Sequence, residues 1–287
     1  MKIDLELPLA VKIRKQIVQA LNDFNMLVEG DKIMVCVSGG KDSSILTVLL
    51  NDIQKRAHFN FTLEAVLLDQ KQPGFNGEVF RQFIESQGVR LTILERDTYS
   101  IVTEKVKDGV YCSLCSRLRR AILYDFANDH GFTKMALGHH RNDLIETTLL
   151  NMLYTGQLAS MPPKLRSDNG RNIVLRPMAY VAEEDLATLA EAWAFPIIPC
   201  NLCGSQEGLK RKRMKRLVND LKKEIPMVET SFLKALSNLR PRHLLDQNLY
   251  NFDLLQVPES SVEINNSSDQ INVKKVDCSS SLDDLGF

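Results

Sequence analysis

Apolar residues along the chain recur at two spacings that alternate with each other. Leu9, Ile13, Ile17, Leu21 and Phe24 repeat every three or four positions, which predicts an opening amphipathic helix. Short runs rich in Val, Ile and Leu predict buried strands. These runs are Ile33–Val37, Leu63–Leu68, Leu91–Leu94, Met135–Leu137, Ile173–Arg176 and a short sixth candidate, Pro196–Ile198. The helical stretches between them are Ser44–Lys55, Gly77–Ser86, Ser116–Asp129, Asp143–Leu153 and Ala182–Ala194.

Strands that alternate with helices predict an α/β fold with a doubly wound, mostly parallel sheet covered on both faces. In such sheets ligands bind beyond the carboxyl ends of the strands. Three segments follow predicted strand ends: the loop after Val37, the region of Asp69 and the turn Gly138-His139-His140. We therefore expect these three segments to share one cleft.

The charge distribution divides the rest of the chain. The segment from Glu207 to Lys223 contains eight Lys or Arg residues and two acidic residues. The chain from Asn251 onward contains seven acidic residues and two lysines. The net charge of zero is therefore the sum of a basic body and an acidic tail. A second helical piece is expected from Thr230 to Leu239, and a disordered tail from about Val257. We divide the chain into an N-terminal helix (1–28), a nucleotide- and metal-binding domain (29–206), a basic helical extension (207–250) and an acidic tail (251–287).

No window approaches the roughly 20 apolar residues of a membrane span, and the N-terminus lacks the apolar core of a secretion signal. We expect a cytoplasmic protein without a membrane partner, whose six cysteines are thiols.

The run Ser38-Gly39-Gly40-Lys41-Asp42-Ser43 lies between a predicted strand and a predicted helix. Two glycines let successive N–H groups converge on one point, the helix N-terminus favours an anion there, and Lys41 adds a full charge. Ser38 and Ser43 are suited to phosphate oxygens, and Asp42 to a magnesium ion. An ordinary glycine turn explains the glycines but not the order strand, loop, helix. We therefore predict a phosphate-binding loop.

This loop is neither G-x-x-x-x-G-K-[ST] nor G-x-G-x-x-G. It resembles the PP-loop, S-G-G-x-D-S, of enzymes that split ATP between its α- and β-phosphates to adenylate a substrate. The resemblance implies that ATP is a substrate.

Two C-x-x-C pairs, Cys112/Cys115 and Cys200/Cys203, lie far apart in the sequence, and each pair is suited to one side of a soft metal centre. Spacing alone does not separate zinc from iron–sulfur, and two chance pairs of buried cysteines or a thioredoxin-like redox pair are the other interpretations. Cys36, inside the first strand, is interpreted as a buried apolar residue. Cys278, in the tail, has no expected structural role.

A wider set of motifs is similar to the tRNA 2-thiocytidine synthetases, in order from roughly Asp31 to Asp246. The motifs are Ser38–Ser43, Cys112-Ser-Leu-Cys115-Ser-Arg-Leu-Arg-Arg120, Gly138-His-His-Arg-Asn-Asp143, Met161-Pro-Pro-Lys164, Arg176-Pro177 and Ile198-Pro-Cys-Asn-Leu-Cys-Gly-Ser-Gln206. The resemblance implies a Rossmann-like fold of the PP-loop adenine nucleotide α-hydrolase type. It also implies a sulfurtransferase that acts on a cytidine at the start of the tRNA anticodon loop.

The resemblance further implies a 4Fe-4S cluster held by Cys112, Cys115 and Cys203, with Cys200 as a bystander. A cluster with an open iron can carry sulfide, whereas a fully ligated one only supports the fold. The family usually has two aspartates after His-His-Arg, but the first is Asn142 here. We therefore place a carboxylate role at Asp143. The resemblance also implies a cysteine desulfurase as sulfur donor and a homodimer.

Other side chains are weaker candidates. His139 or His140 is suited to ATP or substrate, although adjacent residues rarely face one ligand, and Asp69 is either a ribose or adenine contact or a polar residue that ends its strand. Trp193 and Phe195 are expected to pack in the core. Cations expected to bind tRNA phosphates are Arg117, Arg119, Arg120, Lys210, Arg211 and Arg213. A solvated basic face is the alternative for the last three.

The sequence thus predicts an ATP-dependent tRNA sulfurtransferase. The cytidine C2 oxygen attacks the α-phosphate of ATP and pyrophosphate departs. Sulfide carried by the cluster then replaces the activated oxygen, which leaves with AMP. Lys41 offsets the developing phosphate charge, and Asp42 with Asp143 places Mg²⁺. The alternatives are a related adenylating enzyme with structural zinc and another nucleophile, and a non-catalytic, zinc-stabilised RNA-binding protein.

Overall fold

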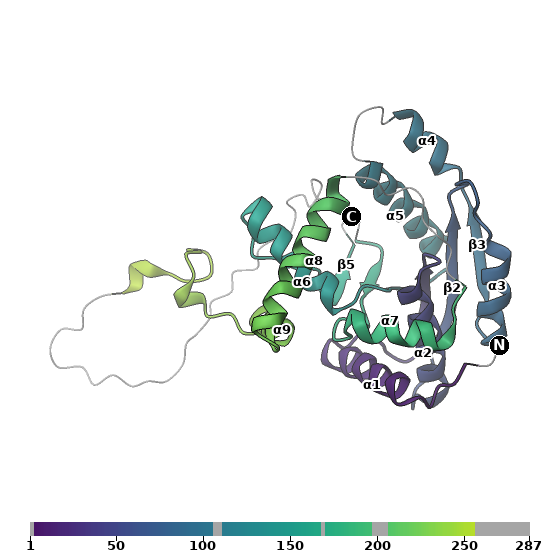
Figure 1. Cartoon of the computed structure of the whole chain (residues 1–287), viewed down its shortest axis with the longest axis horizontal. Coiled ribbons are helices and arrows are strands. Elements are labelled where there is room, and N and C mark those ends of the chain that lie inside the picture. The colour runs from purple at the N-terminus through teal and green to yellow at the C-terminus, as the bar shows by residue number, and fades with distance from the viewer. Residues whose placement is uncertain (1–2, 106–110, 168–169, 197–205, 256–287) are drawn as a thin grey trace.

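The computed structural model describes residues 3–105, 111–167, 170–196 and 206–255. Its centre is a six-stranded sheet in the order β3-β2-β1-β4-β6-β5, in which the pair β5–β6 alone is antiparallel (Figure 1). The strands are β1 (Lys32–Val37), β2 (Thr62–Asp69), β3 (Leu91–Glu95), β4 (Lys134–Leu137), β5 (Lys164–Arg166) and β6 (Ile173–Leu175). The predicted doubly wound, mostly parallel α/β sheet is confirmed.

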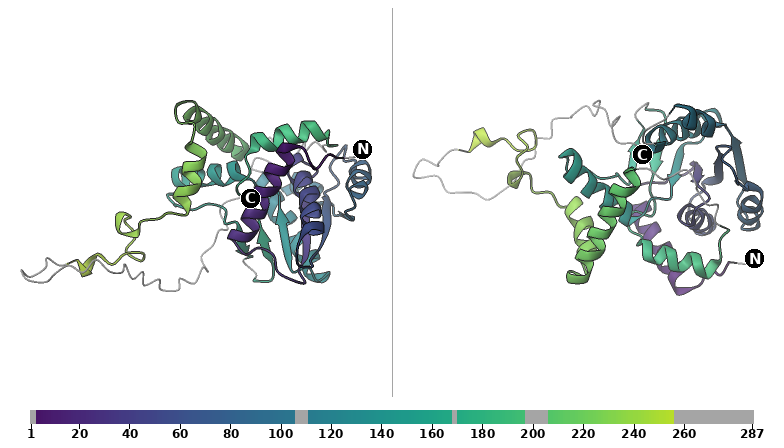
Figure 2. Two further views of the ribbon diagram at one scale, coloured as in Figure 1. Left: turned by 90° about the horizontal axis from the view of Figure 1, so that it is seen from below. Right: turned by 45° about the horizontal axis from the view of Figure 1, so that its top comes forward.

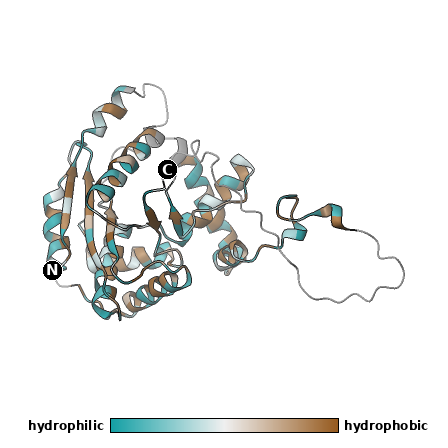
Figure 3. Cartoon of the chain, turned by 180° about the vertical axis from the view of Figure 1, so that it is seen from behind, coloured by the Kyte–Doolittle hydropathy of each residue, from teal (hydrophilic) through white to brown (hydrophobic). Residues whose placement is uncertain are grey.

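Helices cover both faces of the sheet, because alternate residues of the buried strands point to opposite sides. On one face Ile33, Val35 and Val37 pack with the apolar sides of four helices: α1 (Pro8–Asp23), α2 (Lys41–Arg56), α3 (Gly77–Ser86) and α7 (Glu183–Trp193). On the other face Met34 and Cys36 pack against Leu123 and Ala127 of α5 (Tyr111–Asp129). Figure 3 shows the strands as largely apolar, whereas the covering helices carry both apolar and polar residues.

The C-terminal helices lie against α6 (Arg141–Leu150), which continues into the π-helix η1 (Asn151–Thr155). Met214 and Val218 of α8 (Gln206–Glu224) are buried against Ile145 and Leu149 of α6. The short helix α9 (Val228–Leu236) packs beside them. After α9 the chain leads away from the sheet through the 3₁₀ turns Pro241–His243 and Phe252–Leu254, as Figures 1 and 2 both show.

Several predicted boundaries are wrong in an informative way. Helix α2 begins at Lys41, not Ser44, so the loop lysine belongs to the first turn of that helix. Helix α5 spans Tyr111–Asp129 and so already includes the first cysteine pair, which precedes the expected start at Ser116. Helices α6 and α8, the core positions of Trp193 and Phe195, and the burial of Cys36 follow the predictions closely.

Among the strands and α-helices of the described residues, strand β5 and helix α4 (Thr98–Lys105) were not predicted. The sixth predicted strand, Pro196–Ile198, is not among the strands of the sheet: Pro196 is not in a strand, and Ile198 lies outside the described residues. The sheet has β5 as its sixth member. The acidic tail from 256 onward also lies outside them. Within the described part of the chain, no helix is long and apolar enough to cross a membrane.

Candidate active site at the carboxyl edge of the sheet

The loop Ser38–Ser43 closes on itself at the end of β1. Gly39 has a φ of +80°, a conformation that favours glycine, and Gly40 is the N-cap of α2 without a side chain that caps the helix. The Ser43 hydroxyl accepts from the Ser38 amide at 3.1 Å and donates to the Gly40 carbonyl at 3.2 Å. The loop is therefore preformed, and the first-turn amides of α2 are left for an anion.

Lys41 and Asp42 form an ion pair at this helix start. The Lys41 Nζ lies 2.9 Å from Asp42 Oδ1 and 3.0 Å from Oδ2, and each side chain is about one quarter exposed. The ammonium and the carboxylate thus neutralise each other at the mouth of the loop. Both groups are accessible to a phosphate and a divalent cation, respectively.

Gly138, at the end of β4, touches the loop from the neighbouring strand. A Cβ atom at this position would lie 2.9 Å from the Ser43 nitrogen and 3.0 Å from the Ser43 Cα. Strands β1 and β4 are paired in parallel, with Cys36 opposite Leu137, so their ends lie side by side. The expected proximity of the loop and the Gly138-His139-His140 turn is confirmed.

His139 is held as a neutral imidazole. Burial and the charge of Arg176 lower the pKa of His139 to about 4, and the Arg176 Nε donates to His139 Nδ1 at 3.3 Å. The Nδ1 atom is therefore an acceptor, which leaves the proton on Nε2. Burial also lowers the pKa of Arg176, to about 10.

His140 and Asp143 form the N-terminal turn of α6. The Asp143 Oδ2 accepts from the His140 amide at 3.0 Å, and Oδ1 lies 3.6 Å from Arg211 of α8. Burial by itself would raise the pKa of Asp143, but the imidazoles of His140 and His139, the His140 amide and Arg211 lower it below its ordinary value. Asp143 is therefore a carboxylate that helps to cap the helix.

Glu146 lies one turn further along α6 and is buried. Burial and the nearby Asp143 carboxylate raise the pKa of Glu146 to about 7, which Arg211, 3.9 Å away, only partly opposes. Because Arg211 also reaches Thr147, this predicted tRNA-binding residue is turned toward α6.

Asn142 has both ends of its amide engaged. Its Nδ2 donates to the Glu229 carboxylate of α9 at 2.8 Å, and its Oδ1 accepts from the Glu183 amide of α7 at 3.0 Å. Glu229 is buried and also pairs with Arg141. An aspartate at position 142 would face this carboxylate, so the amide suits its surroundings.

Cys115 of α5 reaches the same edge of the sheet. Its thiol donates to the Gln70 side-chain carbonyl at 3.1 Å, and Thr98 donates to the same oxygen at 3.1 Å. Gln70 directly follows β2, which pairs with β1. Cys112 lies one helical turn before Cys115 on α5, and the two positions face the same side of the helix.

A soft metal centre fits this position, because Cys115 carries a half-buried thiol that contacts a neutral amide. The side chain of Cys112 and all of Cys200, Cys203 and Cys278 lie outside the described residues. Among the residues that the structure does describe, no group of three or more His, Cys, Asp or Glu side chains is placed to hold a metal ion.

The remaining candidates are dispersed. Asp69 accepts from the Lys71 amide at 2.7 Å and so closes the turn after β2, as the interpretation of a strand-ending polar residue predicts. Arg117 is exposed, and Arg119 and Arg120 are partly exposed on α5. Arg120 lies close enough to Arg176 to contribute to its lowered pKa, so α5 approaches the end of β6 as well.

Sequence reasoning gave no role to three residues at this edge, although Arg176 belongs to a family motif. Gln70 and Arg176 both directly follow a strand, and this position at the carboxyl edge was a usable signal. Glu229 comes from a distant helix, and no local pattern connects it to Asn142.

Comparisons with known proteins agree with this geometry. Residues 9–196 match the model of the PP-loop domain family. The chain is 62% identical over 254 residues to the tRNA-cytidine(32) 2-sulfurtransferase of Bdellovibrio bacteriovorus, covering 88% of this chain and 98% of that protein. It is 54% identical over 243 residues to the protein of the same name from Tolumonas auensis, covering 84% of this chain and 80% of that protein.

Among solved structures, the fold is similar to the U34-tRNA thiolase NcsA from Methanococcus maripaludis with its 4Fe-4S cluster. The TM-score is 0.63 at 20% sequence identity, over 81% of this chain and 80% of that one. The loop Ser38–Ser43, the cysteine helix and these similarities agree: the chain belongs to the tRNA-cytidine(32) 2-sulfurtransferases, a family of sulfur-transferring enzymes with a PP-loop domain.

Proposed function

We propose that this protein converts cytidine 32 of tRNA to 2-thiocytidine in an ATP-dependent reaction, as the names and the PP-loop domain of its relatives suggest. The single observation that carries the proposal is the contact between Cys115 and Gln70. It supports a cleft shared by the cysteine helix and the ATP-binding loop, because Gln70 follows the strand next to β1.

In this proposal the loop Ser38–Ser43 binds the phosphates of ATP through the amides of the α2 N-terminus. Lys41 leaves Asp42 and stabilises the charge that builds on the α-phosphate and the departing pyrophosphate. Asp42, freed from this ion pair, and Asp143, which stays ionised because of its lowered pKa, are the proposed ligands of Mg²⁺.

The chemistry requires an activated C2–O bond. The C2 oxygen of the cytidine attacks the α-phosphate, the bond to pyrophosphate breaks, and AMP later leaves with that oxygen when sulfur takes its place. The residues proposed to hold the cluster are Cys112, Cys115 and Cys203, and a 4Fe-4S cluster bound there supplies the sulfur for this exchange. The base must leave its stack to reach the cleft, which is less costly in an anticodon loop than in a duplex.

Further parts of the proposal concern partners and organisation. A cysteine desulfurase is the proposed source of sulfur, and a homodimer is the proposed functional unit. The proposed domains keep the boundaries 1–28, 29–206, 207–250 and 251–287. Arg117, Arg119 and Arg120, beside the proposed cluster ligands, and Lys210 and Arg213 on α8 are proposed to contact tRNA phosphates.

Oxygen-free purification followed by assays of iron, acid-labile sulfide and 2-thiocytidine tests the proposal. We expect a brown protein with about four irons per chain, in keeping with cysteine-bound clusters, and thiolation that depends on ATP. Cys203→Ser should lose iron and activity, whereas Cys200→Ser should keep both. Colourless, zinc-loaded protein that releases pyrophosphate without thiolation would instead indicate an adenylating enzyme with another nucleophile, and tRNA binding without ATP consumption would indicate a pure RNA-binding protein.

A further inference from the structure

The cations of α8 divide into two sets with different surroundings. Arg211, Lys215 and Lys222 lie beside the acidic residues of neighbouring helices; for example, Lys215 Nζ lies 2.6 Å from Glu183 Oε1. Met214 and Val218 share this inner side and pack on α6. These cations therefore hold the helix in place.

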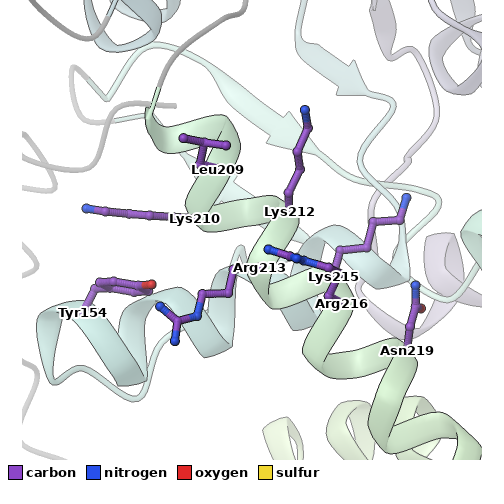
Figure 4. Close-up of a pocket in the computed structure, with 8 residues that line it drawn as sticks. All are labelled: Tyr154, Leu209, Lys210, Lys212, Arg213, Lys215, Arg216 and Asn219. Carbon is purple, nitrogen blue, oxygen red and sulfur yellow. The ribbon is translucent and has the colours of Figure 1, made fainter.

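The outer cations, together with Lys215 of the inner set, line an open pocket of about 540 Å³ (Figure 4). Its walls are Tyr154, Leu209, Lys210, Lys212, Arg213, Lys215, Arg216 and Asn219. None of these is acidic, and within the part of the chain that the structure describes Lys212, Arg213 and Arg216 have no ion-pair partner. Like charges so close together on one helix repel each other, and this repulsion is relieved by an anion.

An aromatic ring forms the opposite wall of the pocket. Tyr154 belongs to the π-helix η1, is 44% exposed, and lies under the Lys210 ammonium at 5.0 Å from the ring centroid. Its neighbours Met152 and Leu153 are also exposed. π-Helical turns, most of them bulges inside α-helices, are frequent at functional sites. Here η1 presents an aromatic face beside several cations.

Proteins bind single-stranded nucleic acid with a row of cations that follows the phosphate backbone and with accessible aromatic rings on which bases stack. The pocket on α8 has both features. The positions from Lys210 to Arg216 span about 9 Å of the helix axis, which is more than one phosphate group occupies. A free mononucleotide would therefore leave part of the basic surface without an anion. An RNA strand satisfies both the length and the charge of the pocket.

We propose that this pocket binds an unpaired segment of the tRNA, with one base stacked on Tyr154 and the flanking phosphates bound by Lys212, Arg213 and Arg216. The inference rests on the proposed function, because that function makes tRNA the substrate. The residues that line the pocket include none of the loop Ser38–Ser43, so the nucleotide on Tyr154 is a different one from the reacting cytidine. The inner cations, Arg211 among them, do not take part in RNA binding.

Binding of unmodified tRNA over a series of salt concentrations tests this proposal. The double variant Arg213→Ala/Arg216→Ala should bind more weakly and reduce the salt-dependence slope by about one per cation removed. Tyr154→Leu should weaken binding by about 5- to 150-fold, the range measured for one stacked base, with the slope unchanged. Tyr154→Phe should bind like the wild type, because it keeps the ring.

Lys223→Ala is the matched control, since Lys223 lies on the same helix but pairs with Asp220 outside the pocket. Wild-type affinity and slope in the double variant, or equal losses in Tyr154→Phe and Tyr154→Leu, would overturn the proposal. The steady-state thiolation assay gives the second readout, in which KM for tRNA should rise more than kcat falls. If the wild-type protein binds tRNA as expected but never thiolates it, the proposed function is wrong. The binding measurements on the variants still show whether the pocket binds tRNA.

Discussion

The Cys115 thiol donates a hydrogen bond to the Gln70 side chain across 3.1 Å, and this contact joins the cysteine helix to the carboxyl edge of the sheet. Gln70 is fixed in turn by the Thr98 hydroxyl. Residues from α5, the end of β2 and the start of α4 therefore meet at one point. The contact orients a proposed cluster ligand toward the edge that also carries Lys41.

Replacing Gln70 with Leu should lower the iron content of the protein. Partners that orient metal ligands typically contribute about 10- to 100-fold in metal affinity, so the cluster should be lost at low iron concentrations. ATP binding should remain, because the loop Ser38–Ser43 does not contact Gln70. Iron analysis and ATP titration of the same preparation check both parts, and full iron occupancy in the variant would refute the orienting role.

Gly138 should tolerate no side chain. In Gly138→Ala the new Cβ meets the Ser43 backbone at 2.9 Å, and overpacking of this kind costs about 1–3 kcal/mol. Because the strain falls on the loop Ser38–Ser43, the proposed phosphate site, we expect ATP affinity to fall about tenfold or more. Gly131→Ala is a suitable control, since Gly131 precedes the same strand, has open space around it and carries only the strain of a φ of +67°. Equal ATP affinity in the two variants would contradict the prediction.

Asn142 and Glu229 should be energetically coupled. Asn142→Asp places a second carboxylate beside the buried Glu229, which now accepts a hydrogen bond at 2.8 Å. We expect a loss of about 2 kcal/mol or more in the free energy of unfolding. In a Glu229→Gln background the same substitution should cost at least about 1 kcal/mol less. Urea denaturation of the four proteins measures this coupling, and additive effects would argue against it.

Glu146 should make stability depend on pH. Its pKa in the folded protein is raised from 4.5 to about 7, so the folded state holds a proton that the unfolded state loses between these values. The wild type should therefore lose stability relative to Glu146→Gln as the pH rises from about 4.5 to about 7, by on the order of 3 kcal/mol. Above this window the difference should be constant. Chemical denaturation at several pH values tests this, and a difference independent of pH would contradict it.

The sequence was sufficient for the sheet and the loop because both depend on local patterns. Continuous Val, Ile and Leu runs mark strands that are buried on both faces, and the glycine pair between strand and helix marks the turn that is proposed to bind phosphate. Strand β5, Lys164–Arg166, has only three residues, two of them charged, so its pattern resembles a loop. Its pairing with β6 determines that it is a strand.

The rest of the site depends on contacts between distant segments. Asn142 with Glu229, and Cys115 with Gln70, join elements whose sequences carry no mutual signal. The basic run on α8 looked uniform in sequence, but packing on α6 turns Arg211 inward and leaves Arg213 at the pocket. Only the acidic residues of the neighbouring helices show which of these cations face inward.

Transfer of oxygen-18 tests the central claim most directly. The substrate is tRNA with oxygen-18 at C2 of cytidine 32, and the products are separated after a single turnover with ATP. Activation at the loop Ser38–Ser43 predicts one labelled oxygen in AMP for each 2-thiocytidine formed, and no product from Lys41→Ala although tRNA still binds. Unlabelled AMP, or ADP as the nucleotide product, would contradict adenylation of the cytidine oxygen.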